Sequence, residues 1–314
     1  MLKAWPVLLV RAALFGALLH LASGAEATLF NVTFQDPTST YATYYSRIIS
    51  HIQAAGSTWA ADLGYATAPS IDVRVGFDSS ISTGNGASLS NRFVHPKGSY
   101  NVYEQGLAAK MFHGIDPNGS TPDVQFNIGV NPSNSYLNKL WFDPDPFSRT
   151  APLDTSKTDA MSFFLHEFGH ALGFNGWRNM ADGSLPASYE STFDQWVTYD
   201  GSNLYFTGPR AEALYGGPLA LTYGNIFHLG NFSPRPGQDL LPDLMNGLVF
   251  YDGHRYGVSP LDIAILRDAE VSLRPFPIVG RLSPGAVPEP ATLAPVLSLA
   301  LWARRACRRQ LRER

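Results

Sequence analysis

Three short stretches in the first half of the chain alternate between apolar and polar residues. Residues 29–36, 70–80 and 123–132 follow this alternation, which is typical of β-strands with one buried face. Between them, residues 40–63 and 101–114 carry apolar side chains at a spacing close to the helical repeat. The pattern therefore predicts strands alternating with helices in a mixed α and β architecture.

The most apolar helical pattern covers residues 153–174. Residues 154–156 are Asp, Thr and Ser, which favour the N-cap position, and Gly173 favours the end of a helix. A second glycine, Gly56, lies inside the predicted helix at residues 40–63 and is expected to bend or split it. The first half of the chain is therefore expected to contain three helices.

The second half of the chain has a different character. Residues 175–275 are rich in glycine, proline and asparagine and predict short elements, apart from a helix at residues 259–271 with Ser259 at its N-cap. We therefore expect an α+β domain over residues 26–275. Its N-terminal half should hold a twisted mixed sheet and the apolar helix, and its C-terminal half should be irregular and loop-rich. Residues 276–287 read as a linker.

Charge and cysteine content exclude several functions. The net charge is −3, but residues 304–314 hold six arginines and one glutamate, so the remainder is clearly acidic. Because phosphate contacts need clustered Lys and Arg, nucleic acid is not an expected partner. The single cysteine is Cys307, so the predicted domain has neither an internal disulfide nor a thiolate nucleophile.

The first 25 residues read as a secretory signal peptide. Lys3 precedes a mostly apolar run, and small residues at 23–27 offer cleavage sites. We therefore expect the protein to be exported.

The C-terminal segment has three parts in order. Pro288, Glu289 and Pro290 come first, an apolar run at residues 291–303 follows, and the arginine cluster ends the chain. A helix over that run would rise about 20 Å, less than the roughly 30 Å hydrocarbon core, so it predicts a marginal membrane anchor. Residues 288–314 resemble the PEP-CTERM sorting signal of exopolysaccharide-producing Gram-negative bacteria. The resemblance implies transient inner-membrane anchoring, processing by an exosortase, and a final location at the cell surface or outside the cell, with extracellular polysaccharide as a candidate partner.

The sequence HEFGH at residues 166–170 is the strongest chemical signal. His166 and His170 are one helical turn apart and leave the same helix face, while Glu167 is rotated away from them. This spacing suits two zinc ligands and a general base. The preceding residues are too apolar for a surface helix, so the two imidazoles are expected in a buried setting where they need partners.

A catalytic zinc site needs a third protein ligand, which this motif does not contain. The compact metzincin spacing would place it at position 176, which is glycine. Three candidates remain: Glu190, His228 and His254. Glu190 has the spacing of thermolysin-type glutamate zincins, but Gly173 indicates a helix that ends too early for that arrangement. Met245 fits either a turn beneath the metal or ordinary core packing.

Four segments together resemble the metzincin metalloproteases with a long insert, a group that includes leishmanolysin-like enzymes and PEP-CTERM-bearing bacterial enzymes. They are HEFGHALGF (166–174), FHLGN (227–231), DLMNG (243–247) and GHRYGVSPLDIAILRDAEV (253–271). The resemblance covers about residues 30–275 and implies a zincin or metzincin-like fold. It also implies that His166, His170 and His228 bind zinc, with Glu167 as the general base and Met245 in the Met-turn.

Two clusters of oxygen-bearing side chains raise calcium as a second metal. The same residue types are common turn formers, so the signal is weak. The side chains concerned are Asp116, Asn118, Asp123, Asp143 and Asp145.

The expected function is an exported zinc endopeptidase that hydrolyses protein or peptide substrates. Residues 123–132 are a candidate edge strand on which an extended substrate could pair. Two alternatives remain open: a non-catalytic surface or matrix protein associated with exopolysaccharide, and a glutamate zincin that uses Glu190.

Replacing Pro288, Glu289 and Pro290 by alanine should leave the protein membrane-associated in a host that has the sorting machinery. The reason is that processing would lose its recognition element while the apolar run stays. Cell fractionation measures the outcome. Unchanged release of the variant would contradict the sorting signal.

Overall fold

The computed structural model describes residues 30–65 and 70–269. Contacts divide the chain into two units, Met1–Val271 and Ser272–Arg314, and every described residue belongs to the first. The predicted signal peptide, linker and sorting segment lie outside the described residues.

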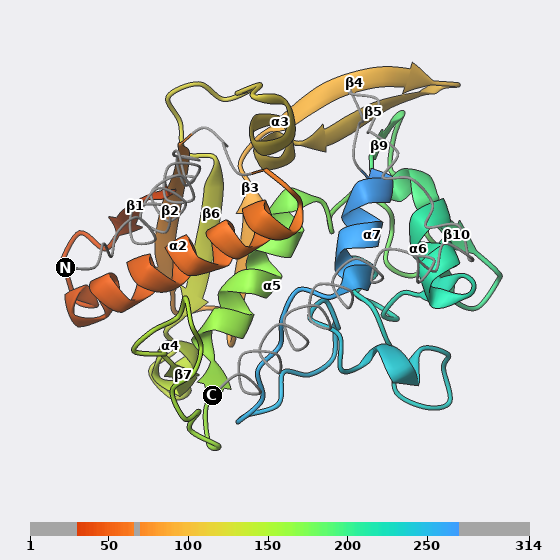
Figure 1. Ribbon diagram of the computed structural model, residues 1–314. Helices are drawn as coiled ribbons and strands as arrows, with labels where there is room; N and C mark the ends of the chain where they lie inside the picture. Colours follow the sequence, from red (N-terminus) through yellow and green to blue (C-terminus); the bar gives the residue numbers. More distant parts are fainter. Residues whose placement is uncertain (1–29, 66–69, 270–314) are drawn as a thin grey trace, which may run out of the picture. The chain divides into compact units, whose positions relative to one another are not determined.

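The described residues form an α+β structure (Figure 1). Its α-helices are α2 (Tyr45–Asp62), α3 (Gly106–His113), α4 (Tyr136–Lys139), α5 (Ala160–Leu172), α6 (Pro209–Tyr215) and α7 (Pro260–Ala269). Short 3-10 helices are η1 (Ala42–Tyr44), η2 (Asp194–Trp196) and η3 (Gln238–Leu240). Its strands are β1 (Phe30–Gln35), β2 (Ile71–Asp78), β3 (Gly84–Ser88), β4 (Asn91–Lys97), β5 (Tyr100–Gln105), β6 (Val124–Gly129), β7 (Leu140–Trp141), β8 (Thr158–Asp159), β9 (Tyr189–Ser191), β10 (Val197–Tyr199), β11 (Leu204–Phe206) and β12 (Leu219–Ala220).

The main sheet has the strand order β1-β2-β6-β3. Strands β1, β2 and β6 run parallel, and β3 runs antiparallel to β6. This sheet confirms the three strands predicted from alternation, but one expectation was wrong. The strand at residues 123–132 is not an edge strand, because β3 covers its outer side.

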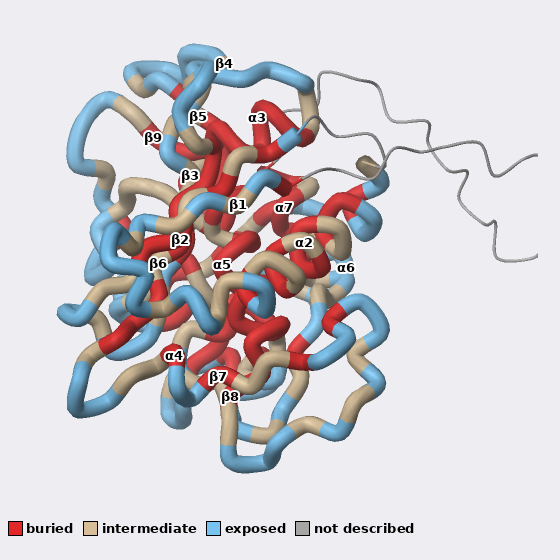
Figure 2. Tube along the Cα trace, turned by 90° about the vertical axis from the view of Figure 1, so that its left-hand side faces the viewer, coloured by how far each residue is buried: buried red, intermediate tan, exposed pale blue. Residues whose placement is uncertain are grey.

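Helices α2 and α5 cover the same face of this sheet (Figure 1). Phe126 of β6 packs edge-on against Phe164 and Phe168 of α5, with ring centroids 5.9 and 4.9 Å apart. The indole Nε1 of Trp59 in α2 donates to the Leu165 carbonyl at 2.9 Å. Figure 2 shows the buried residues gathered along α2, α5 and the sheet. These contacts fix the position of α5, which carries the histidines.

Gly56 does not bend or split its helix, because α2 runs unbroken from Tyr45 to Asp62. A Cβ atom at this position would overlap the ring of Phe30 on β1. The glycine therefore allows close packing of helix against strand.

Two other expectations were partly wrong. Residues 101–114 were predicted as one helix, but Tyr100–Gln105 is a strand that pairs with β4 and β9, and α3 begins only at Gly106. The helix predicted from residue 153 begins at Ala160, where Asp159 caps it by accepting the amide of Ser162 at 3.1 Å. Residues 154–156 form a turn instead.

The C-terminal half has short elements, as predicted. Helix α7 follows Ser259, whose hydroxyl accepts the Asp262 amide at 3.0 Å, so its predicted N-cap is confirmed. Among residues 30–65 and 70–269, no helix combines the length and apolar character needed to cross a membrane.

Gly56→Ala should destabilise the protein by about 1–3 kcal/mol, because the overlap with Phe30 outweighs a helix-propensity gain of about 1 kcal/mol. Urea unfolding measures this. Adding Phe30→Leu should make the double variant less destabilised than the sum of the two single changes. Gly217→Ala is the control, since a Cβ there meets nothing within 4 Å. Strict additivity would contradict the packing role of Gly56.

Candidate metal centre

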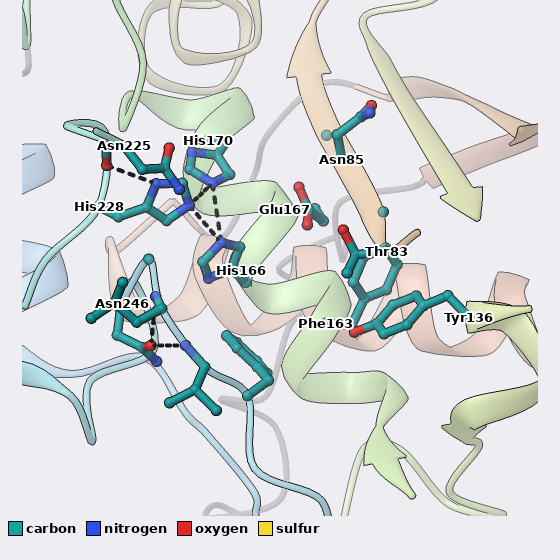
Figure 3. Close-up of a pocket in the computed structure, with 16 residues that line it drawn as sticks. Thr83, Asn85, Tyr136, Phe163, His166, Glu167, His170, Asn225, His228 and Asn246 are labelled. Carbon is teal, nitrogen blue, oxygen red and sulfur yellow. Dashed lines mark hydrogen bonds between the residues drawn. The ribbon is translucent and has the colours of Figure 1, made fainter. Parts of the chain in front are cut away.

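Three histidine side chains converge at one end of a cavity (Figure 3). His166 and His170 come from α5, and His228 comes from the loop after β12. The Nε2 atoms of His166 and His170 are 3.1 Å apart, and the Nε2 of His228 lies 3.1 and 2.9 Å from them. These three residues are therefore able to hold a metal ion.

Backbone carbonyls determine the tautomer of all three rings. A carbonyl oxygen only accepts hydrogen bonds, so each Nδ1 that contacts one must carry the ring proton. The partners of His166, His170 and His228 are the carbonyls of Leu244 at 2.7 Å, Phe174 at 2.8 Å and Asn225 at 3.2 Å, respectively. Each neutral ring therefore turns an Nε2 lone pair toward the other two.

Burial keeps these rings neutral. Desolvation lowers the pKa of His166 to about 3 and that of His170 to about 4, and it also lowers the pKa of His228 well below 6.5. Three converging lone pairs cannot hydrogen-bond to one another, so a cation between them would relieve their repulsion. Zinc bonds of about 2.0–2.1 Å at tetrahedral angles place nitrogen atoms about 3.3–3.4 Å apart. The observed spacing needs only a small expansion, so the histidines fit zinc.

Met245 packs directly against the helix between its two histidines. The side chain is fully buried, and a Cβ atom at Gly169 would lie 2.5 Å from its sulfur. The Met245 carbonyl accepts the Leu229 amide at 2.8 Å, which joins this turn to the segment that carries His228. The Met245 turn is therefore fixed both to α5 and to the segment that carries His228.

Glu167 faces the same cavity, which has a volume of about 320 Å³. Burial raises the pKa of Glu167 to about 8, while a hydrogen bond from the Gly86 amide opposes this shift. A Cβ at Gly86 would lie 2.6 Å from the Cβ of Glu167, so glycine is needed where β3 passes the helix. Glu167 therefore lies between the histidines and the outer strand of the sheet.

Strand β3 presents a free edge to the cavity. Among the described strands it pairs with β6 alone. The Thr83 carbonyl accepts the Gly129 amide at 2.6 Å, and bonding to the partner alternates along an antiparallel strand. Gly84 and Gly86 therefore direct their backbone groups away from β6 and line the cavity, where the Gly86 amide donates to Glu167.

The structure separates Glu190 and His254 from the histidine cluster. Glu190 lies on β9, with Lys97 Nζ at 3.2 Å and an Arg178 nitrogen at 3.8 Å. His254 packs near the rings of Tyr251 and Tyr256. A side chain at the compact position, Gly176, would overlap the Asp194 carboxyl.

The candidate calcium clusters are neutralised by basic side chains. Lys110 Nζ lies 2.9 Å from both Asp116 and Asp123, and an Arg255 nitrogen lies 2.9 Å from Asp143. Within the described part of the chain, the histidine cluster is the single group of three or more His, Cys, Asp or Glu side chains placed to hold a metal. The calcium expectation therefore finds no support.

The sequence pattern missed several residues of the site. Thr83, Tyr136 and Asn225 line the cavity, as does the segment after Met245. The stretch TGNGAS at residues 83–88 has the composition of a loop and carries no strand signal. Tyr136 packs edge-on against Phe163 of α5, a contact that no sequence spacing reveals.

Comparison with known proteins adds no assignment: no family model, no curated protein and no solved structure matches the chain. The structure itself shows a histidine cluster able to hold a metal ion. The similarity to metzincins stays a prediction.

His228→Ala should weaken zinc binding by about three orders of magnitude or more, because one of three ligands is lost. Glu190→Ala and His254→Ala are the matched comparisons, and both should retain one equivalent of zinc. Elemental analysis and competition with a chromophoric chelator measure the effect. Retention of zinc by His228→Ala, together with its loss from either comparison variant, would show that the cluster is not the site.

Proposed function

We propose that this chain is an exported zinc-dependent endopeptidase of the zincin type. The observation that carries the proposal is one cavity that joins three converging imidazole nitrogens, a buried glutamate and a free strand edge. Each of these parts corresponds to one requirement of peptide-bond hydrolysis.

His166, His170 and His228 would hold the zinc ion. Three neutral ligands leave the full charge of the metal in place and a further coordination position open. Zinc there would supply Lewis-acid polarisation of the substrate carbonyl and activation of water. The carbonyls that hold each Nδ1 proton would keep the rings oriented during the reaction.

Glu167 would act as the general base and then as the general acid. Its carboxylate would take a proton from the attacking water and return it to the departing amine nitrogen. Its pKa of about 8 reflects burial, and a nearby dication would lower it. The Gly86 amide would hold the carboxylate in place.

The free edge of β3 would bind the substrate backbone. An extended peptide laid along the outer edge of β3 would pair with the backbone of Gly84 and bring its carbonyl toward the histidines, while the Gly86 amide stays with Glu167. The two glycines let β3 lie close to α5, because a Cβ atom at Gly84 would overlap Phe163 and one at Gly86 would overlap Glu167. The predicted substrate strand thus moves from residues 123–132 to β3.

The proposal of a metzincin-like fold draws support from the mixed sheet with its antiparallel outer strand and from the packing of Met245. Export and sorting draw their support from the sequence at the two ends of the chain. The Glu190-based alternative loses its basis, because that side chain is paired with Lys97 and Arg178. A purely structural surface protein would have no need for Glu167 in the cavity.

Glu167→Gln should lower the hydrolysis rate of an internally quenched peptide by about 10²–10⁴-fold. Zinc content should be unchanged, because the residue is a base and not a ligand. Glu190→Gln is the matched control and should keep both activity and zinc. Full activity of Glu167→Gln, or the absence of any hydrolysis by the zinc-loaded wild-type protein on casein and a mixed peptide library, would reject the endopeptidase assignment.

A further inference from the structure

The turn that carries Met245 is held by the carboxyl group of Asp243. One oxygen of this carboxyl accepts the Met245 amide at 2.9 Å, and the other accepts the Ser259 hydroxyl at 2.8 Å. Leu244 lies between Asp243 and Met245 in this turn, and its carbonyl accepts a hydrogen bond from Nδ1 of His166. The orientation of one candidate metal ligand therefore depends on the geometry of this turn.

A second carboxyl group, from Asp262, lies behind the first. It is fully buried at the start of α7, and its Oδ2 accepts the Ser259 amide at 2.8 Å. Its Oδ1 has no donor among the described residues, yet the side chain is within hydrogen-bonding reach of Asp243. Two carboxyl groups can hydrogen-bond only when they share a proton.

Burial and the neighbouring charge both place that proton on Asp262. Desolvation, followed by the charge of Asp243, raises the pKa of Asp262 well above 3.8. Both causes favour the neutral form of Asp262, which has a proton to donate to the Asp243 carboxyl. The shared proton links α7 to the turn below the histidines.

We propose that Asp243 and Asp262 form a carboxyl pair that positions the metal centre. In this arrangement Asp262 donates to Asp243, Asp243 holds the turn, and the Leu244 carbonyl keeps His166 in the tautomer that exposes its Nε2. Both residues act through the turn and neither touches the metal. The inference rests on the metal site of the proposed function and is independent of peptidase chemistry.

Asp268 provides a matched comparison on the same helix. Its side chain is also buried, and it accepts the amides of Arg210 and Ala211 at 2.9 Å at the start of α6. Replacing Asp268 by alanine should lower the free energy of unfolding, as replacing Asp262 should. Within residues 30–65 and 70–269 its hydrogen bonds and ion pair go to Trp196, Arg210 and Ala211 and not to the turn at residues 243–246, so it should not affect the metal.

The test measures cobalt(II) affinity and the cobalt d–d absorption spectrum of the full chain, alongside its free energy of unfolding. Asp243→Ala and Asp262→Ala should each weaken cobalt binding by about 10–100-fold and alter the spectrum, as expected for partners of ligands. Asp262→Asn should restore wild-type affinity, because its amide donates to Asp243 without needing a proton. Asp268→Ala should lose stability and keep wild-type affinity.

Two results would overturn the inference: failure of Asp262→Asn to restore affinity, or an equal loss of affinity in Asp268→Ala. If the alanine variants do not fold, the two isosteric variants Asp243→Asn and Asp262→Asn test the proposal instead. Asp243→Asn should bind cobalt more weakly than Asp262→Asn, because the asparagine amide cannot accept the Ser259 hydroxyl as well as the Met245 amide. Equal affinities for these two variants would reject the pair. A wild-type chain that binds no cobalt would reject the metal site itself, which separates that failure from the failure of the carboxyl pair alone.

Discussion

The convergence of three neutral imidazoles is the constraint on which the rest of this structure depends. Their Nε2 lone pairs repel one another at 2.9–3.1 Å, and burial removes the water that would otherwise separate them. The rings stay in place because the carbonyls of Phe174, Asn225 and Leu244 hold their Nδ1 protons. Those carbonyls belong to three separate segments, so the end of α5, the His228 loop and the Met245 turn must all be positioned together.

Two glycines, which have no side chain, allow these segments to pack closely enough to hold this arrangement. Gly169 lets the Met245 sulfur rest against α5, and Gly86 lets β3 pass beside Glu167. The sheet and α2 hold α5 from the other side, through aromatic contacts and the Trp59 hydrogen bond. Helix α5 therefore packs against the sheet and α2 on one side and against the irregular C-terminal half on the other. The loop-rich half supplies the third histidine and the turn, which are the parts that a helix alone cannot provide.

Local periodicity was sufficient to predict the helices and strands whose apolar spacing and backbone hydrogen bonding suit a regular element. Strands β1, β2 and β6 and helices α2, α5 and α7 follow apolar repeats that any neighbour could bury. The four-residue spacing of His166 and His170 likewise depends on helix geometry alone. The boundaries were less predictable, because Asp159 caps α5 and strand pairing claims residues 100–105. The pairing of β5 with β9 depends on a partner far away in the sequence, whereas the Asp159 cap is a local contact with Ser162.

The sequence by itself determined the α+β class, the helix with two histidines and a glutamate, and a short set of candidate third ligands. Tertiary structure decided which candidate lies beside the two helix histidines, since His228 reaches them while Glu190 is paired with basic side chains. It also turned a glycine-rich stretch into the edge strand β3. The physical reason is common to both decisions. A metal ligand set and a strand edge are defined by distances between segments, and one-dimensional spacing carries no information about those distances once the connecting loops are long and irregular.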